Sequence, residues 1–186
     1  MNKALGQIYW GYIFIFFRIH FGIDLLADPI GYFLIYSGCS KLIKAYPVAQ
    51  KAKIVALIGA FISIPSVFVN LSETTLSFSW STYAGLLFVV KMIMGYYLFT
   101  ILKDVTKTFG DRALQQRTEN TFKYYVAIHL IAFALLSFSM NVSENGVFIL
   151  SLASAIGVLG MDIVFFFLVG AIRRVSPEQL RVNTFI

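Results

Sequence analysis

Six long apolar segments, separated by short polar stretches, constrain this chain more than any other feature. They cover residues 8–23, 29–43, 54–70, 81–102, 124–140 and 147–170. A helix needs about 20 residues to cross a hydrocarbon core of about 30 Å, so the fourth and sixth segments are long enough, whereas the first two are short. The pattern predicts an all-α bundle of about six transmembrane helices in one integral membrane domain, residues 1–186. For the first pair, a hairpin of half-depth helices buried against the bundle is the alternative.

The composition agrees with a membrane protein, because 59% of the residues are hydrophobic and 13% are charged. A soluble globular chain carries about a quarter charged residues and needs them to cover its core. Cys39 is the one cysteine, which excludes a disulfide framework and a thiolate metal cage. With two histidines in the whole chain, neither a metal nor another cofactor is expected.

The cationic residues predict the orientation. Thirteen of the fifteen Lys and Arg residues fall on one side of the segment map, at Lys3, Lys41, Lys44, Lys51, Lys53, Lys103, Lys107, Arg112, Arg117, Lys123, Arg173, Arg174 and Arg181. The loops on the other side contain Asp24, Asp28, Glu73 and Glu144 and no Lys or Arg. Basic loops stay in the cytoplasm, so both termini are expected there, in a multi-pass plasma-membrane protein. Because topology accounts for the net charge of +6, no basic stripe is left for nucleic acid.

Aromatic residues near the segment ends are expected at the two membrane interfaces. On the inner side these are Tyr9, Trp10, Tyr12, Tyr46, Tyr96, Tyr97, Tyr124 and Tyr125, and on the outer side Trp80 and Tyr83.

Two local signals predict where helices begin, and a third predicts a bend. Asp28 followed by Pro29 is typical of a helix N-cap and first helical residue, so the second helix should begin there. Asp111, after Gly110, should cap a helix that starts at Arg112. Pro65 lies inside the third segment and should bend that helix.

Four ionisable residues lie inside the segments: Arg18, Lys91, His129 and Asp162. Each costs a few kcal/mol, roughly, at mid-bilayer unless it is paired or hydrated, so these are the first candidates for a functional site. The depths of the residues allow either a His129–Asp162 contact or a Lys91–Asp162 pair. Such a pair either fixes helix register or forms part of a proton or ion pathway.

A second cluster lies at the outer turn, where His20, Asp24 and Asp28 are spaced four apart. On a continuous helix they would share one face and could meet a divalent cation. Because a helix is expected to start at Pro29, the three residues are not expected to lie on one continuous helix. We therefore favour neutralisation of Arg18 by Asp24 or Asp28 over metal binding.

Small residues concentrate in the sixth segment. Ser151 and Ala155 are four apart, as are Ala153 and Gly157, a spacing that lets another helix approach closely. The neighbour is either a helix of the same chain or a partner, a second copy included.

The segment from Gly22 to Leu42, GIDLLADPIGYFLIYSGCSKL, resembles a stretch in small, largely uncharacterised multi-pass membrane proteins of Bacillus-like Gram-positive bacteria. In those proteins an aspartate-rich turn precedes an Ile-Gly-Tyr helix that ends in a glycine and a Lys-Leu pair. The resemblance implies a bacterial plasma membrane and no particular activity.

No catalytic signature is present: the chain lacks a nucleophile elbow, a paired-histidine zinc motif and a phosphate-binding glycine loop. An enzyme is therefore not predicted. The leading hypothesis is a small accessory or regulatory membrane subunit that acts through helix contacts and the basic loop 103–123. The alternative is a small-solute or ion transporter or channel that uses Lys91 and Asp162. Convergence of Lys91, His129 and Asp162 on a cavity would favour transport.

Overall fold

Six α-helices and one short β-hairpin make up the part of the chain that the computed structural model describes, residues 1–16, 20–21, 23–24, 28–68, 78–138 and 144–182. In chain order the elements are α1 (Asn2–Phe16), β1 (His20–Phe21), β2 (Ile23–Asp24), α2 (Asp28–Leu42), α3 (Ala49–Ile62), the 3₁₀ helix η1 (Ile64–Val67), α4 (Phe78–Phe109), α5 (Arg112–Phe138) and α6 (Glu144–Val182). Over these residues the predicted all-α class with six helices is confirmed.

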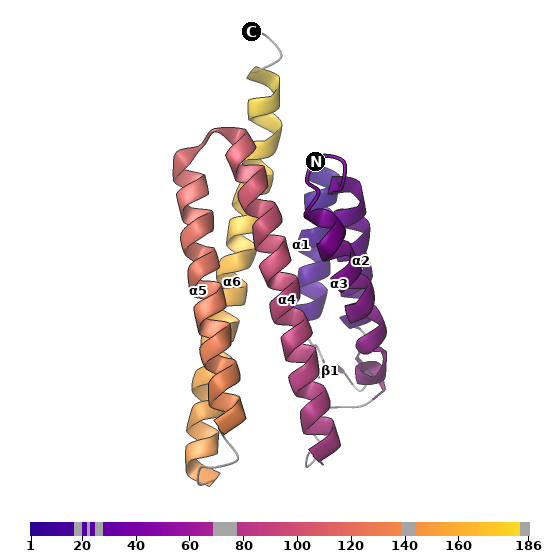
Figure 1. The fold of residues 1–186 in the computed structure, drawn as a ribbon, viewed down its shortest axis with the longest axis vertical. Helices are drawn as coiled ribbons and strands as arrows, with labels where there is room; N and C mark the ends of the chain where they lie inside the picture. The colour runs from indigo at the N-terminus through magenta and orange to yellow at the C-terminus, as the bar shows by residue number, and fades with distance from the viewer. Residues whose placement is uncertain (17–19, 22, 25–27, 69–77, 139–143, 183–186) are drawn as a thin grey trace.

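The helices form a closed bundle. Helices α1, α2 and α3 lie on one side of α4, and α5 and α6 lie on the other (Figure 1). Each helix contacts the next along the chain, and α6 returns to contact α1. The N-terminus, the α4–α5 corner and the C-terminal end of α6 lie at the same end of the bundle (Figure 1). This is the arrangement that the loop charges predict.

Two helices among the described residues are long and apolar enough to cross a membrane, α4 over Ser79–Phe109 and α6 over Phe148–Val175. Helices α1, α2 and α3 have 15, 15 and 14 residues. At 1.5 Å per residue they are about 21–22 Å long, less than a hydrocarbon core of about 30 Å. The lengths of α1, α2 and α3 therefore do not support six full membrane spans. The first pair has the dimensions of the alternative, a helical hairpin of partial depth.

The first helix starts and ends earlier than predicted. The apolar run begins at Ile8, but α1 begins at Asn2 and ends at Phe16. Ala4 and Leu5 are buried in the core together with Ile8. Tertiary packing therefore extends the helix beyond the apolar run that marked it.

Very close packing joins α1 to α2. A Cβ atom added at Gly11 would lie 2.6 Å from the carbonyl oxygen of Gly31, and one added at Gly31 would lie 2.6 Å from that of Gly11. Gly38, seven residues after Gly31, lies equally close to α1, with its added Cβ 2.8 Å from the carbonyl oxygen of Ala4. Small residues thus set this helix–helix distance, at a place that the sequence reading did not identify.

Pro65 ends a helix rather than bending one. Helix α3 stops at Ile62 and Pro65 lies in η1, because proline has no amide hydrogen to continue the ladder. The Tyr83 hydroxyl donates to the Ile62 carbonyl at 2.8 Å and accepts from the Ser66 amide at 3.2 Å. Tyr83, expected at an interface, therefore also satisfies the backbone at this break.

The α4–α5 corner matches its sequence signals. Gly110 has a φ of 71°, which favours glycine. The Oδ1 atom of Asp111 accepts from the Leu114 amide at 3.0 Å, as expected of a helix cap. Helix α5 then begins at Arg112, so this prediction is confirmed.

Candidate functional site

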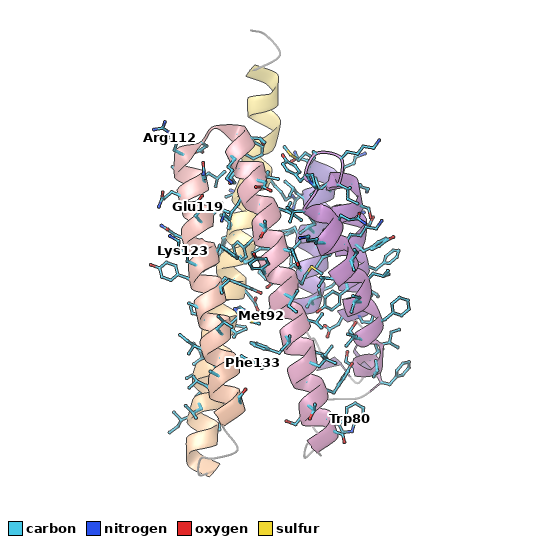
Figure 2. All side chains as sticks on the ribbon, viewed as in Figure 1. Trp80, Met92, Arg112, Glu119, Lys123 and Phe133 are labelled. Atoms are coloured by element: carbon cyan, nitrogen blue, oxygen red, sulfur yellow. The ribbon has the colours of Figure 1, made fainter. Side chains whose placement is uncertain are left out.

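Lys91 and Asp162 form an ion pair in the middle of the bundle. Helix α4 carries Lys91, next to Met92 in Figure 2, and helix α6 carries Asp162. The Nζ atom of Lys91 lies 2.5 Å from Oδ2 of Asp162, and the two side chains are 18% and 1% exposed. Of the two contacts that the depth argument allowed, the structure forms this one. Pairing offsets the cost of holding each charge away from water.

Two tyrosine hydroxyls form a series of hydrogen bonds that ends at the Asp162 carboxylate. The Tyr12 hydroxyl donates to Oδ1 of Asp162 at 2.7 Å. The hydroxyls of Tyr12 and Tyr125 lie 3.0 Å apart. Because the single hydroxyl hydrogen of Tyr12 points to Asp162, Tyr125 is the donor to Tyr12. A continuous chain of hydrogen bonds therefore runs from Tyr125 through Tyr12 to Oδ1 of Asp162, and Lys91 is paired with the other carboxylate oxygen, Oδ2.

His129 lies beside this chain but is not bonded to Asp162. Its Nδ1 atom is 2.9 Å from the carbonyl oxygen of Tyr125, one turn earlier in α5. A carbonyl can only accept, so Nδ1 carries the hydrogen and Nε2 of the neutral ring has a lone pair. Nε2 is buried and has no hydrogen-bond partner among the described residues. The ring stacks on Tyr125, with the centroids 3.9 Å apart, and on Phe88, with the centroids 5.8 Å apart.

Lys91 lines two cavities. The first has a volume of about 250 Å³ and is lined by Lys91, Asp28 and Tyr32 with apolar neighbours. The second, of about 390 Å³, is lined by Lys91, Asp162 and Ser154, also with apolar neighbours. A cavity of this size holds several waters, since a water occupies about 30 Å³ in the liquid. Lys91 therefore faces both spaces while it is bonded to Asp162.

Ser154 is a further polar residue of the second cavity. It is 6% exposed, and its Oγ atom has no hydrogen-bond partner among the described residues. A buried hydroxyl without a partner costs about 1–3 kcal/mol. Ser154 is therefore suited to bind a water or a polar ligand in this cavity.

The four small residues predicted to pack α6 have different surroundings. Ser151 and Ala155 line the second cavity. Gly157 faces α5, where an added Cβ would lie 3.2 Å from Cγ2 of Ile128. Ala153 is exposed. The four residues therefore lie in three environments: the second cavity, the contact with α5 and the exposed surface.

The outer-turn cluster does not share a helical face. His20 and Asp24 are paired Cα partners in the antiparallel strands β1 and β2. Asp28 begins α2, is buried and lines the first cavity. Arg18 and the ion pairs expected of it lie outside the described residues. The described residues contain no group of three His, Cys, Asp or Glu side chains that could hold a metal ion.

Tyr12, Tyr125 and Ser154 are the site residues that sequence reasoning missed. Both tyrosines were expected at the inner interface, but they are 1% and 0% exposed. Trp10, expected there as well, is 55% exposed. One signal was available for Tyr12, because it follows Leu5 and Ile8 at the spacing of a single helical face.

Comparisons of the chain with protein family models, with curated proteins and with solved structures find no match. Function is therefore argued from the geometry of the site. Five side chains with ionisable groups are thus gathered in one place: Lys91, Asp162, Tyr12, Tyr125 and His129. Lys91 and Asp162 line spaces that can hold water, whereas Tyr12, Tyr125 and His129 line neither of them.

Proposed function

We propose that the protein is a multi-pass plasma-membrane protein that conducts protons across the bilayer through the site formed by Lys91 and Asp162. The observation that carries this proposal is that Lys91 lines both cavities while it is paired with Asp162. An ionisable pair within a membrane is costly and is characteristic of ion and proton pathways.

The surface of the bundle supports a membrane location. Large apolar side chains are exposed along α3 and α6, at Ile54, Leu57, Ile58, Phe61, Phe148, Ile149, Leu152, Ile156, Leu159, Ile163 and Phe167. Soluble monomers seldom expose continuous apolar faces of this extent. Arg112 and Trp80 lie at opposite ends of the bundle (Figure 2), as expected for an inner basic end and an outer aromatic end.

Proton movement would act on the pair itself. A proton that reaches Asp162 from the second cavity neutralises the carboxylate and weakens its hold on Lys91. The ammonium group is then free to interact with water in the first cavity. The ammonium group releases a proton to this water, and the neutral amine then takes the proton from the Asp162 carboxyl group. This restores the ion pair and moves one proton from the second cavity to the first.

Proteoliposomes with a pH-sensitive dye inside and a potassium diffusion potential set by valinomycin test this proposal. The wild-type protein should acidify the lumen, and both Lys91→Met and Asp162→Asn should abolish the signal. The matched controls are Lys107→Met and Asp104→Asn, because these residues form an exposed pair on the same helix, 3.7 Å apart. Proton flux that is unchanged in the two site variants, at equal reconstitution, would overturn the proposal.

A second candidate function is an accessory subunit that docks on a partner through α6. One observation favours it: Gly160 is exposed and has open space around the position of a Cβ atom, and Ala153 lies seven residues earlier on the same exposed face. Small residues allow close approach of a helix in lipid. Purification in mild detergent tests this function: a partner should be retained by the wild type and lost in Gly160→Leu. Recovery of the protein as a monomer without a partner, together with no effect of substitutions in the loop 103–123 on partner retention, would count against this function.

A further inference from the structure

A groove between α1, α5 and α6 combines two exposed arginines with an apolar floor. Its volume is about 570 Å³. Arg117 of α5 and Arg174 of α6 line it, together with Ile13, Ile163 and Phe167. Arg174 lies eleven residues after Ile163 on α6, about 16 Å along the helix axis. The groove is therefore cationic toward the end that carries the termini and apolar toward the middle of the bundle.

The two arginines are available for a ligand. Both are exposed, and among the described residues neither lies within 4 Å of a carboxylate. No Asp or Glu lines the groove. At Gly170, on its wall, an added Cβ would meet nothing within 4 Å, so there is room against the helix backbone.

A neighbouring groove of about 690 Å³, lined by Lys41 and Arg173, provides a contrast. There Lys41 donates to Oε1 of Gln7 at 2.8 Å. The Arg173 guanidinium lies 5.2 Å from the centroid of the Tyr9 ring. Two of its cations, Lys41 and Arg173, thus have partners within the chain, whereas Arg117 and Arg174 have none among the described residues.

We infer that the groove of Arg117 and Arg174 binds an anionic phospholipid of the inner leaflet. Guanidinium groups suit a phosphate, because they donate parallel hydrogen bonds to two of its oxygens. An acyl chain then follows the apolar side chains of Ile13, Ile163 and Phe167 toward the bilayer centre. Basic pockets between helices on the cytoplasmic side are typical sites for such headgroups. The inference rests on the membrane location in the proposed function, but not on proton conduction.

Thermal unfolding of the full chain in a neutral detergent, with phosphatidylglycerol or phosphatidylcholine titrated in, tests this site. The wild type should be stabilised by phosphatidylglycerol and much less by phosphatidylcholine. The double variant Arg117→Gln with Arg174→Gln should weaken phosphatidylglycerol binding at least tenfold. The control is Arg112→Gln with Lys123→Gln, two exposed positions of α5 (Figure 2) that do not line the groove. It removes the same charge and should change phosphatidylglycerol binding less than twofold.

Three outcomes would overturn the inference. They are equal phosphatidylglycerol binding by the double variant and the wild type, equal stabilisation by phosphatidylcholine, and equal stabilisation by glycerol 3-phosphate, which has the anion without acyl chains. Proton flux in phosphatidylcholine vesicles separates the two proposals. There the double variant should conduct like the wild type, so loss of lipid binding and loss of conduction are distinguished.

Discussion

The Tyr12 hydroxyl donates a 2.7 Å hydrogen bond to Oδ1 of Asp162, which links the first helix of the chain to the last. Both residues are 1% exposed. Because Asp162 also holds Lys91 of α4, three helices meet at one carboxylate. The hydrogen bond from Tyr12 therefore requires α1 to be packed against α6.

Tyr12→Phe should destabilise the protein by about 1–3 kcal/mol, because it leaves a buried carboxylate oxygen and the Tyr125 hydroxyl each short of a partner. Unfolding by denaturant in detergent micelles measures this change. Tyr9→Phe is the control, since the Tyr9 ring packs on Phe166 and its hydroxyl has no hydrogen-bond partner among the described residues. An equal effect of the two substitutions would contradict the buried chain of hydroxyls.

Lys91→Met and Asp162→Asn should each cost up to about 3–5 kcal/mol of unfolding free energy, because each leaves a buried charge without its partner. The double variant should lose less than the sum of the single losses. The same cycle at Asp104 and Lys107, an exposed pair, should give a coupling of at most about 1 kcal/mol. Additive effects at Lys91 and Asp162 would mean that the pair is not energetically coupled.

Gly31→Ala should destabilise the packing of α1 on α2 by about 1–3 kcal/mol, since the new methyl group meets the Gly11 backbone. Gly85→Ala is the matched control in α4, where an added Cβ has no neighbour within 4 Å. That substitution should be neutral or stabilise the helix by up to about 1 kcal/mol. Thermal unfolding of both variants in the same detergent tests this. Gly31→Ala should lower the unfolding temperature, whereas Gly85→Ala should leave it unchanged or raise it.

Cysteine labelling in intact cells checks the orientation. Cys39, the native cysteine, is fully buried and is replaced by alanine in the starting variant. Ser81→Cys, beside Trp80 at one end of the bundle, should react with a membrane-impermeant maleimide added outside. Arg112→Cys, at the other end (Figure 2), should react only after permeabilisation. The reverse pattern would invert the inner and outer assignments, including that of the lipid groove.

Sequence patterns predicted the second half of the chain well, for physical reasons. Helices α4 and α6 follow from their long apolar runs, and the start of α5 follows from Gly110 and Asp111. The depth of Lys91 and Asp162 followed from counting residues along helices of fixed rise. Because both charges need a partner, their pairing was one of two contacts that the sequence allowed.

Other features depend on tertiary packing, which a single sequence does not give. Tyr12 and Tyr125 are amphipathic, so they suit a membrane interface and a buried polar cluster equally well. The contact of Gly11 with Gly31 depends on which helices are neighbours. His20 lies in the first predicted helical segment, 8–23, but the chain pairs it with Asp24 across two strands.

Helix α4 runs without a break from Phe78 to Phe109. It carries Lys91 in its middle, and at its C-terminal end it joins the lysine- and arginine-rich corner at Gly110. Successive turns of one continuous helix are joined by backbone hydrogen bonds, so the two ends and the middle of α4 are mechanically connected. A shift of α4 along its axis, imposed at the Gly110 corner, would therefore also move Lys91 relative to Asp162.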